Sequence, residues 1–208
     1  MDQNLSLTLI VSTQSASPRT VVELIDLAFT GGVTAVQLRE KDLPARDFYN
    51  LATEVALFCR QSKRPIIIND RLDLALAVGA DGLHLGQDDL PLEVARKFWP
   101  RPKTLGATTK TPQAAQKAQE LGADYLGIGA LFPSPSKPTA PVMALETIEA
   151  IKRQVSLPLI GIGGITAENA SLAWSWGFDG LAVISAITGS PEPTQAARDI
   201  LAKRPPKI

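Results

Sequence analysis

Charged residues follow several short apolar runs of this chain, and their types suit the binding of phosphate and a divalent cation. Arg39 and Lys41 follow one run and Lys137 lies in a proline-rich segment, and such cations donate hydrogen bonds to phosphate oxygens. Asp70 and Asp89 follow two other runs. Two carboxylates facing one pocket repel each other unless a cation lies between them, and Mg²⁺ is typically held by one or two carboxylates plus substrate phosphates. These residues therefore indicate a magnesium–diphosphate site.

Small residues near the end of the chain form a second candidate anion site. Gly163 and Gly164 follow one apolar run, whereas Ile184 and Ser185 end another. Backbone N–H groups can approach a phosphate closely at such positions. Two anion sites indicate a reaction that joins two phosphorylated fragments, or one that acts on a substrate carrying both groups.

The elements that must position these residues are predicted by alternation. Short β-branched or leucine-rich runs recur, and each is followed by a stretch with helical spacing. The predicted strands are 7–12, 35–38, 66–69, 82–85, 104–107, 125–129, 158–163 and 180–185. The predicted helices begin near Pro18, Pro44, Arg71, Leu92, Thr111, Leu145, Thr166 and Pro193, with Thr111 and Thr166 as N-caps.

Eight strand–helix units in 208 residues predict a single compact α/β domain, a closed (β/α)8 TIM barrel spanning 1–208 with a loose tail at about 204–208. A weak repeat of glycine, turn and strand supports the count, at 31–38, 79–86, 122–129 and 177–184. A doubly wound open sheet is the alternative, but the glycine-rich nucleotide turn typical of that fold does not follow the first strand. In a barrel the active site lies at the C-terminal ends of the strands, where the charged residues are found.

The composition argues against several other classes of protein. Lys+Arg and Asp+Glu are both 21, so no net charge favours nucleic acid or an anionic membrane. The single cysteine, Cys59, cannot form an intrachain disulfide. No signal peptide is recognisable, and the apolar runs are far shorter than the roughly 20 residues of a membrane span. We expect a soluble, cytoplasmic protein whose oligomeric state has no signal in the sequence.

Four segments resemble the thiamine-phosphate synthase family. They are QLREKD (37–42), INDRLDLALAVGADGLHLGQDDLP (68–91), GADYLGIGALFPSPSKPTAP (122–141) and GIGGITAENA (161–170). The resemblance implies a (β/α)8 barrel transferase that condenses 4-amino-2-methyl-5-hydroxymethylpyrimidine diphosphate with a thiazole phosphate, carboxylated or not. The implied products are thiamine phosphate and diphosphate, and the implied cofactor is Mg²⁺.

The resemblance also implies a role for individual residues. The pyrimidine diphosphate would be bound by Gln37, Leu38, Arg39, Glu40, Lys41, Asn69, Thr108 and Lys137. The thiazole phosphate would be bound by Ser134, Pro135, Ser136, Gly164, Ile184 and Ser185. Asp70 and Asp89 would hold Mg²⁺. No side chain would act as a nucleophile, because the diphosphate can leave before the thiazole nitrogen attacks.

The sequence leaves other interpretations open. A thiazole tautomerase-type barrel needs no diphosphate–magnesium site, and its relatives use a His where this chain has Lys110. A non-catalytic thiamine phosphate-binding protein is expected to have lost the metal carboxylates. An isomerase or aldolase barrel needs a Schiff-base lysine or a glutamate base at a strand end. Asp70 could also be only an ion-pair partner of Arg71 or Arg39, and we expect His84 to point into the barrel and form hydrogen bonds there.

Overall fold

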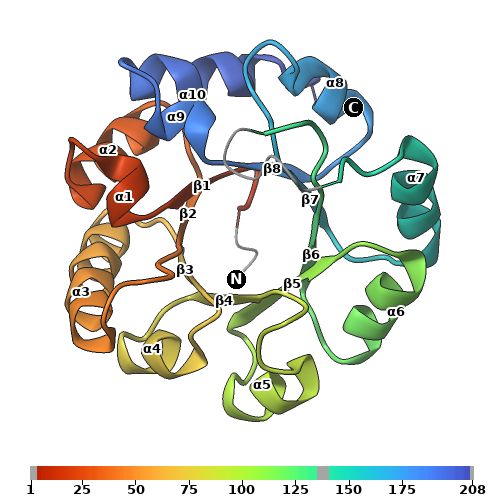
Figure 1. Cartoon of the computed structure of the whole chain (residues 1–208), viewed down its shortest axis with the longest axis horizontal. Coiled ribbons are helices and arrows are strands. Elements are labelled where there is room, and N and C mark those ends of the chain that lie inside the picture. The colour runs from red at the N-terminus through yellow and green to blue at the C-terminus, as the bar shows by residue number, and fades with distance from the viewer. Residues whose placement is uncertain (1–3, 135–140, 207–208) are drawn as a thin grey trace.

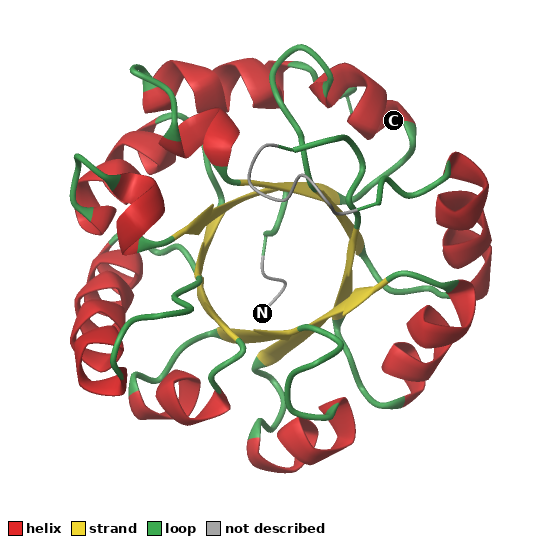
Figure 2. Ribbon diagram, viewed as in Figure 1, coloured by secondary structure: helices red, strands yellow, loops and turns green. Residues whose placement is uncertain are grey.

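The computed structural model describes residues 4–134 and 141–206, and in it eight parallel strands close into a barrel in chain order. Figure 1 and Figure 2 look down this barrel, with the strands as an inner ring and the helices around it. The strands are β1 (Leu7–Val11), β2 (Ala35–Leu38), β3 (Ile66–Asn69), β4 (Gly82–Leu85), β5 (Thr104–Thr109), β6 (Tyr125–Ile128), β7 (Leu159–Ile162) and β8 (Gly180–Val183). The predicted (β/α)8 barrel is confirmed, and the open sheet is excluded because β1 pairs with β8.

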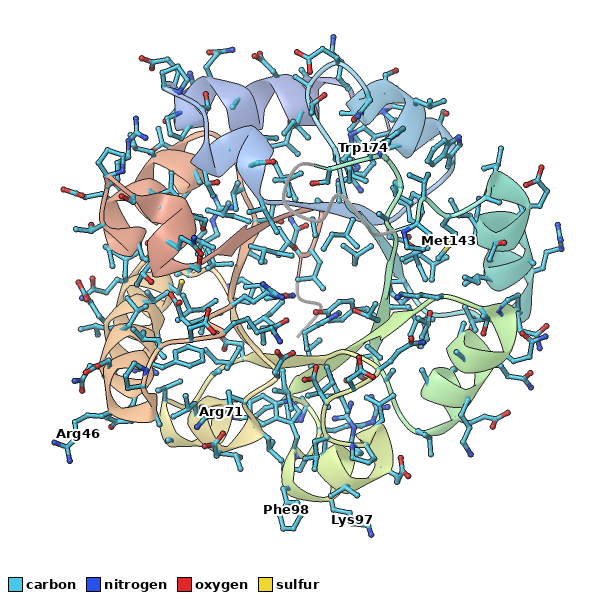
Figure 3. All side chains as sticks on the ribbon, in the orientation of Figure 1. Arg46, Arg71, Lys97, Phe98, Met143 and Trp174 are labelled. Atoms are coloured by element: carbon cyan, nitrogen blue, oxygen red, sulfur yellow. The ribbon has the colours of Figure 1, made fainter. Side chains whose placement is uncertain are left out.

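Helices follow the strands and cover the outside of the barrel (Figure 2). Those in the described residues are α1 (Thr13–Ala16), α2 (Val21–Thr30), α3 (Ala45–Gln61), α4 (Leu72–Ala77), α5 (Leu92–Phe98), α6 (Pro112–Glu120), α7 (Leu145–Gln154), α8 (Ala170–Ser175), α9 (Ser185–Thr188) and α10 (Pro193–Ala202). Helix α6 begins after the predicted N-cap, since the Thr111 side chain accepts a hydrogen bond from the backbone of Ala114. Arg46, Lys97 and Phe98 point outward at the edge of the molecule (Figure 3).

Two details of the helices differ from the sequence prediction. The N-cap of α8 is Asn169 and not Thr166, whose backbone N–H donates to the Asn169 side chain at 2.8 Å. Helices α1 and α9 were not predicted, because four residues are too few to show a helical period.

The repeated turns before four strands hold the N-terminal mouth of the barrel together. In each turn, an Asp or Thr side chain accepts a hydrogen bond from the first or second backbone N–H of the preceding strand. The backbone N–H of the same Asp or Thr donates to the carbonyl of that strand residue. Asp81 pairs with Ile66, Asp124 with Leu105, Asp179 with Leu159, and Thr34 with Leu7, over side-chain distances of 2.8–3.0 Å. These repeats are therefore structural and lie at the end of the barrel opposite the predicted site.

The core has two parts. A large apolar layer fills the space between barrel and helices, and it includes Cys59 and Trp174. Burial raises the pKa of the Cys59 thiol to about 12, which agrees with a purely structural role. A small cluster around Ile10, Ile67 and Ile160 lies inside the barrel.

The predicted loose tail at 204–208 is described as far as residue 206. Arg204, the first residue of the predicted loose tail, donates hydrogen bonds to the Ser6 hydroxyl and to the Asp179 carbonyl. Residues 207–208 lie outside the described residues. Within the described chain, no helix combines the length and apolar character that a membrane crossing requires.

Candidate functional site

Asp70 and Asp89 face each other at the C-terminal rim of the barrel, just beyond β3 and β4. Burial raises the pKa of Asp89, and a hydrogen bond with the Asp70 carboxyl group and its negative charge raise it further. The Gly86 backbone N–H donates to Asp89 Oδ2 at 2.6 Å, and a Cβ at Gly86 would lie 2.9 Å from the same oxygen. The close approach of Asp89 therefore depends on a glycine at position 86.

The backbone of Asp70 is held in an unusual conformation. Its φ angle is 64°, in the left-handed region that few residues other than glycine adopt. The Asp70 N–H donates to the His84 carbonyl at 2.9 Å, so β4 fixes this turn. Such strain concentrates at functional sites, where the side-chain direction matters more than the backbone energy.

Two cations lie at the same rim, after β2. Lys41 Nζ forms an ion pair with Asp70 Oδ2. Arg71 is instead paired with Asp73, at 2.6 Å, so it is not the partner of Asp70 that the sequence left open. Within the described residues Arg39 forms no ion pair and is half-buried, which leaves its guanidinium available for an anion.

The other residues of the segment 37–41 have different surroundings. Gln37 is 5% exposed and lies at the inside of the barrel, whereas Leu38 is buried in the outer core and can offer a ligand only its backbone. The Glu40 carboxylate accepts a hydrogen bond from the Thr13 backbone N–H at 2.6 Å. Glu40 therefore holds the start of α1 against the loop that carries Arg39 and Lys41.

Asn69 and Thr108 are the last residues of β3 and β5, respectively, that face the inside of the barrel. Asn69 pairs with His84 across β3 and β4, next to Asp70. Thr108 Oγ1 lies 2.8 Å from Nε2 of His84. His84 points into the barrel as predicted, and its Nδ1 lies 2.9 Å from the Tyr125 hydroxyl.

The second predicted anion site lies on the loops after β7 and β8. Gly163 and Gly164 have φ angles of 99° and 66°, and a Cβ at either position would clash with the backbone or Ala130 of the loop after β6. Ile184 is the N-cap of the four-residue helix α9, and Ser185 is its exposed first residue. Phosphate sites in barrels are frequently built from these two loops and the N-terminus of a short extra helix.

Some predicted residues lie on the loop between β6 and α7. Ser134 is half-buried, whereas Pro135, Ser136 and Lys137 lie outside the described residues. The loop begins beside the glycine pair, since the Phe132 N–H donates to the Gly163 carbonyl at 3.0 Å. The ring of Phe132 stacks on Trp176 with centroids 5.3 Å apart.

The acidic pair fits a magnesium ion that shares its coordination with a substrate. No three His, Cys, Asp or Glu side chains converge on one point in the part of the chain that is described, so a complete protein cage is absent there. Mg²⁺ commonly takes only one or two carboxylates and completes its shell with phosphate oxygens and water. Two carboxyl groups close enough to share a hydrogen bond, with Lys41 beside them, match that requirement.

A hollow of about 1040 Å³ opens at the N-terminal mouth of the barrel. Its cations are already bound, because Arg101 pairs with Asp124 at 2.7 Å and Arg204 with the Ser6 hydroxyl. The rim that carries Asp70, Asp89 and Arg39 is therefore the better candidate site.

Sequence reasoning missed Tyr125 and Gly86 as parts of this site. Tyr125 looked like an ordinary strand residue, and its contact with His84 spans 41 positions of the chain. Gly86 follows β4 directly, in the segment LHLGQDD. A glycine three residues before a candidate metal ligand was the available signal.

The fold and the rim together define a (β/α)8 barrel that carries, at the C-terminal ends of its strands, an acidic pair suited to a divalent cation. Residues 7–187 match the model of the family described as thiamine monophosphate synthase. The thiamine-phosphate synthase of Natronomonas pharaonis is 43% identical over 201 residues, which covers 95% of this chain and 94% of that protein. That of Ruminiclostridium cellulolyticum is 45% identical and covers 94% and 93%. The chain therefore belongs to the thiamine monophosphate synthase family, and the resemblance seen in the sequence is confirmed.

A solved structure agrees with this assignment. The thiamine phosphate pyrophosphorylase from Pyrococcus furiosus superposes with a TM-score of 0.87 at 36% identity, and the match covers 97% of this chain and 96% of that one. The match spans nearly the whole of the closed eight-stranded barrel and its ring of helices, which Figure 1 shows for this chain.

Proposed function

We propose that this protein condenses 4-amino-2-methyl-5-hydroxymethylpyrimidine diphosphate with a thiazole phosphate, giving thiamine phosphate and diphosphate. The observation that supports this best is the facing pair of Asp70 and Asp89 with Lys41 beside it, at the C-terminal rim of a barrel of this family. A diphosphate is the substrate group that needs such a mixture of carboxylates and cations. We expect the enzyme to act in the cytoplasm, as the sequence predicts, and to bind no nucleic acid or membrane.

The leaving group is bound by the cations and polar side chains of the rim. Arg39, Lys41, Asn69 and Lys137 hold the diphosphate, and the Thr108 hydroxyl donates to it. Asp70 and Asp89 would hold Mg²⁺, which when bound neutralises the charge that develops on the departing diphosphate. Gln37 contacts the aminopyrimidine ring from inside the barrel, with the backbone of Leu38 and the loop held by Glu40 beside it.

The reaction then needs positioning and electrostatic stabilisation more than a reactive side chain. The bond between the methylene carbon and the diphosphate oxygen breaks first, and its electron pair leaves with the diphosphate. The amino-substituted pyrimidine ring stabilises the resulting carbocation. The lone pair of the thiazole nitrogen then forms the new bond to the methylene carbon. Preorganised cations around the leaving group and two aligned fragments supply the rate enhancement.

The thiazole phosphate binds across the barrel mouth from the diphosphate. Its phosphate accepts hydrogen bonds from the backbone at Gly164, Ile184 and Ser185, where the first turn of a helix has free N–H groups. Ser134, Pro135 and Ser136 contact the thiazole ring. This arrangement is supported by the positive φ angles of the glycine pair and by the short helix α9.

The experiment is a product assay on the purified protein with both phosphorylated fragments, with Mg²⁺ or with a chelator. We expect thiamine phosphate only when the metal is present. The tautomerase alternative predicts rearrangement of the thiazole substrate without coupling, and the binding-protein alternative predicts bound thiamine phosphate without turnover. A folded protein that binds the thiazole phosphate but forms no thiamine phosphate would contradict the proposal.

A further inference from the structure

A chain of buried polar side chains runs through the inside of the barrel below the rim. Its members come from four strands: Gln37 of β2, Tyr125 of β6, His84 of β4 and Thr108 of β5. The Gln37 side chain hydrogen-bonds Tyr125, the Tyr125 hydroxyl lies 2.9 Å from His84 Nδ1, and His84 Nε2 lies 2.8 Å from Thr108 Oγ1. Gln37, Tyr125 and His84 are each less than 10% exposed. The chain thus links the two ends of the proposed pyrimidine diphosphate site through the interior.

The strands make room for this chain with glycines. A Cβ at Gly106 would fall on the ring of Tyr125, and one at Gly127 would lie 3.1 Å from Cε1 of His84. The two rings are tilted by 35° with centroids 5.4 Å apart. A cavity of about 30 Å³ between the members leaves space for about one water molecule.

The charge state of the ring limits how hydrogens can be shared along the chain. Burial lowers the pKa of His84 to about 4, against the opposing effect of Asp89, and burial raises the pKa of Tyr125. Both groups are therefore neutral near pH 7, and a neutral imidazole has one donor and one acceptor nitrogen. A phenol is more acidic than the aliphatic hydroxyl of a threonine and is therefore the better hydrogen-bond donor, which leaves the Tyr125 oxygen to accept from the Gln37 amide. The phenol hydrogen then finds its acceptor at His84 Nδ1.

We propose that His84 is a positioning residue, a neutral imidazole with its hydrogen on Nε2. In this form it couples Tyr125 to Thr108 and so fixes the direction in which every hydrogen bond of the buried polar chain is donated. The Gln37 amide nitrogen is used by Tyr125, which leaves its carbonyl oxygen to accept from the amino group of the pyrimidine. The Thr108 oxygen is used by His84, which leaves its hydrogen to be donated to the diphosphate. This inference rests on the proposed function for the two outer contacts, but the tautomer of His84 does not.

The first test is nitrogen NMR of the protein labelled with ¹⁵N-histidine. His84 is the only histidine in the protein, so both ring ¹⁵N signals belong to it, and their couplings to the ring C–H protons distinguish Nδ1 from Nε2. At neutral pH we expect Nε2 to be protonated and Nδ1 to be unprotonated, with no averaging between the two tautomers. A hydrogen on Nδ1, a charged ring or a rapid mixture of tautomers would overturn the proposal. The result is independent of catalysis, so it separates a failure of this inference from a failure of the proposed function.

The second test measures coupling between residues that His84 alone connects. Tyr125→Phe and Thr108→Val each remove one hydroxyl with little change of shape, and each is expected to lower kcat/KM for the pyrimidine diphosphate about tenfold. Because both break the same chain, the double variant should lose little more than the worse single variant. Losses that multiply to about a hundredfold, or a Tyr125→Phe variant with unchanged kcat/KM, would overturn the proposal.

Thr109→Val is the matched control for Thr108→Val. Thr109 is 3% exposed, and its hydroxyl is the buried side-chain atom without a hydrogen-bond partner among the described residues. Its replacement removes the same hydroxyl one position further along β5. We expect kcat/KM within twofold of the wild type, and a loss as large as that of Thr108→Val would show that the effect is merely structural.

Discussion

At the scale of single residues, Asp70 combines a candidate metal-ligand position with a costly backbone conformation. Its φ of 64° directs the carboxylate toward Asp89 and Lys41 while the chain turns from β3 into α4. A glycine would adopt this angle at no steric cost, whereas residues with a Cβ lose about 1–2 kcal/mol in the left-handed region. The sequence thus retains a less stable residue at this turn, which is expected where the side chain has a function.

Asp70→Gly and Asp70→Ala separate the two effects. Both variants lose the carboxylate and the ion pair with Lys41, so both should lose synthase activity. The glycine variant should be about 1 kcal/mol more stable than the alanine variant, because only alanine is strained at this φ. Urea unfolding of the two proteins measures the difference, and equal stabilities would contradict the strain assigned to Asp70.

Some residues of the site could be placed correctly from the sequence, and others could not. The positions of Asp70, Asp89, Arg39 and Lys41 at one rim were predictable, because all follow strands and parallel strands end on one side of a barrel. The partners of His84 were not, because they lie 41 and 24 positions away and depend on the register of β4, β5 and β6.

At the scale of elements, the strands were more predictable than the short helices. β2, β3 and β4 have the predicted bounds because their apolar runs end abruptly at turns. β5 continues two residues further, to Thr109, since polar threonines still pair with β6. Ser12 ends β1 one residue earlier than predicted, because its side chain caps α1. Such capping depends on side-chain hydrogen bonds that hydrophobic periodicity does not register.

The repeated turns predict an element-scale effect on stability without an effect on catalysis. Asp179→Ala removes the acceptor of the Leu159 N–H, a 2.9 Å hydrogen bond that joins the turn before β8 to β7. We expect the free energy of unfolding to fall by about 1–2 kcal/mol, because a strand N–H loses its partner. Activity per folded molecule should stay unchanged, since this mouth lies opposite the site.

Asp179→Asn is the control for this prediction. It keeps a side-chain oxygen that can accept the same hydrogen bond, so it should recover most of the lost stability. Thermal unfolding and the product assay measured on both variants give the comparison. An alanine variant that is fully stable, or one that is stable but inactive, would contradict a purely structural role of the repeat.

At the scale of the whole molecule, barrel closure places ionisable and polar groups in an interior without bulk water. His84 is the clearest case, with a pKa lowered from 6.5 to about 4 by burial. Between these values the unfolded chain binds a proton that the folded chain does not, so the free energy of unfolding falls as the pH falls. The loss of unfolding free energy caused by His84 is absent above about pH 6.5 and reaches about 3 kcal/mol near pH 4.

His84→Asn should remove this acid sensitivity. Asparagine has no ionisable group, so its stability should fall less steeply than that of the wild type between pH 6.5 and 4. Urea midpoints measured at half-unit intervals of pH would give the two slopes. Parallel curves would mean that His84 binds its proton equally in the folded and unfolded states, contrary to its burial inside the barrel.

If Asp70 and Asp89 hold the magnesium ion that the diphosphate shares, removing either carboxylate must change the Mg²⁺ dependence of thiamine phosphate formation. Asp70→Asn keeps the shape and a residue type that tolerates a positive φ but removes the charge. Asp73→Asn, three positions on, removes an exposed carboxylate that pairs only with Arg71 among the described residues. We predict that Asp70→Asn raises the Mg²⁺ concentration for half-maximal rate at least about tenfold and that Asp73→Asn leaves it unchanged. An Asp70→Asn enzyme with the Mg²⁺ dependence and rate of the wild type would mean that Asp70 is not a ligand of the ion.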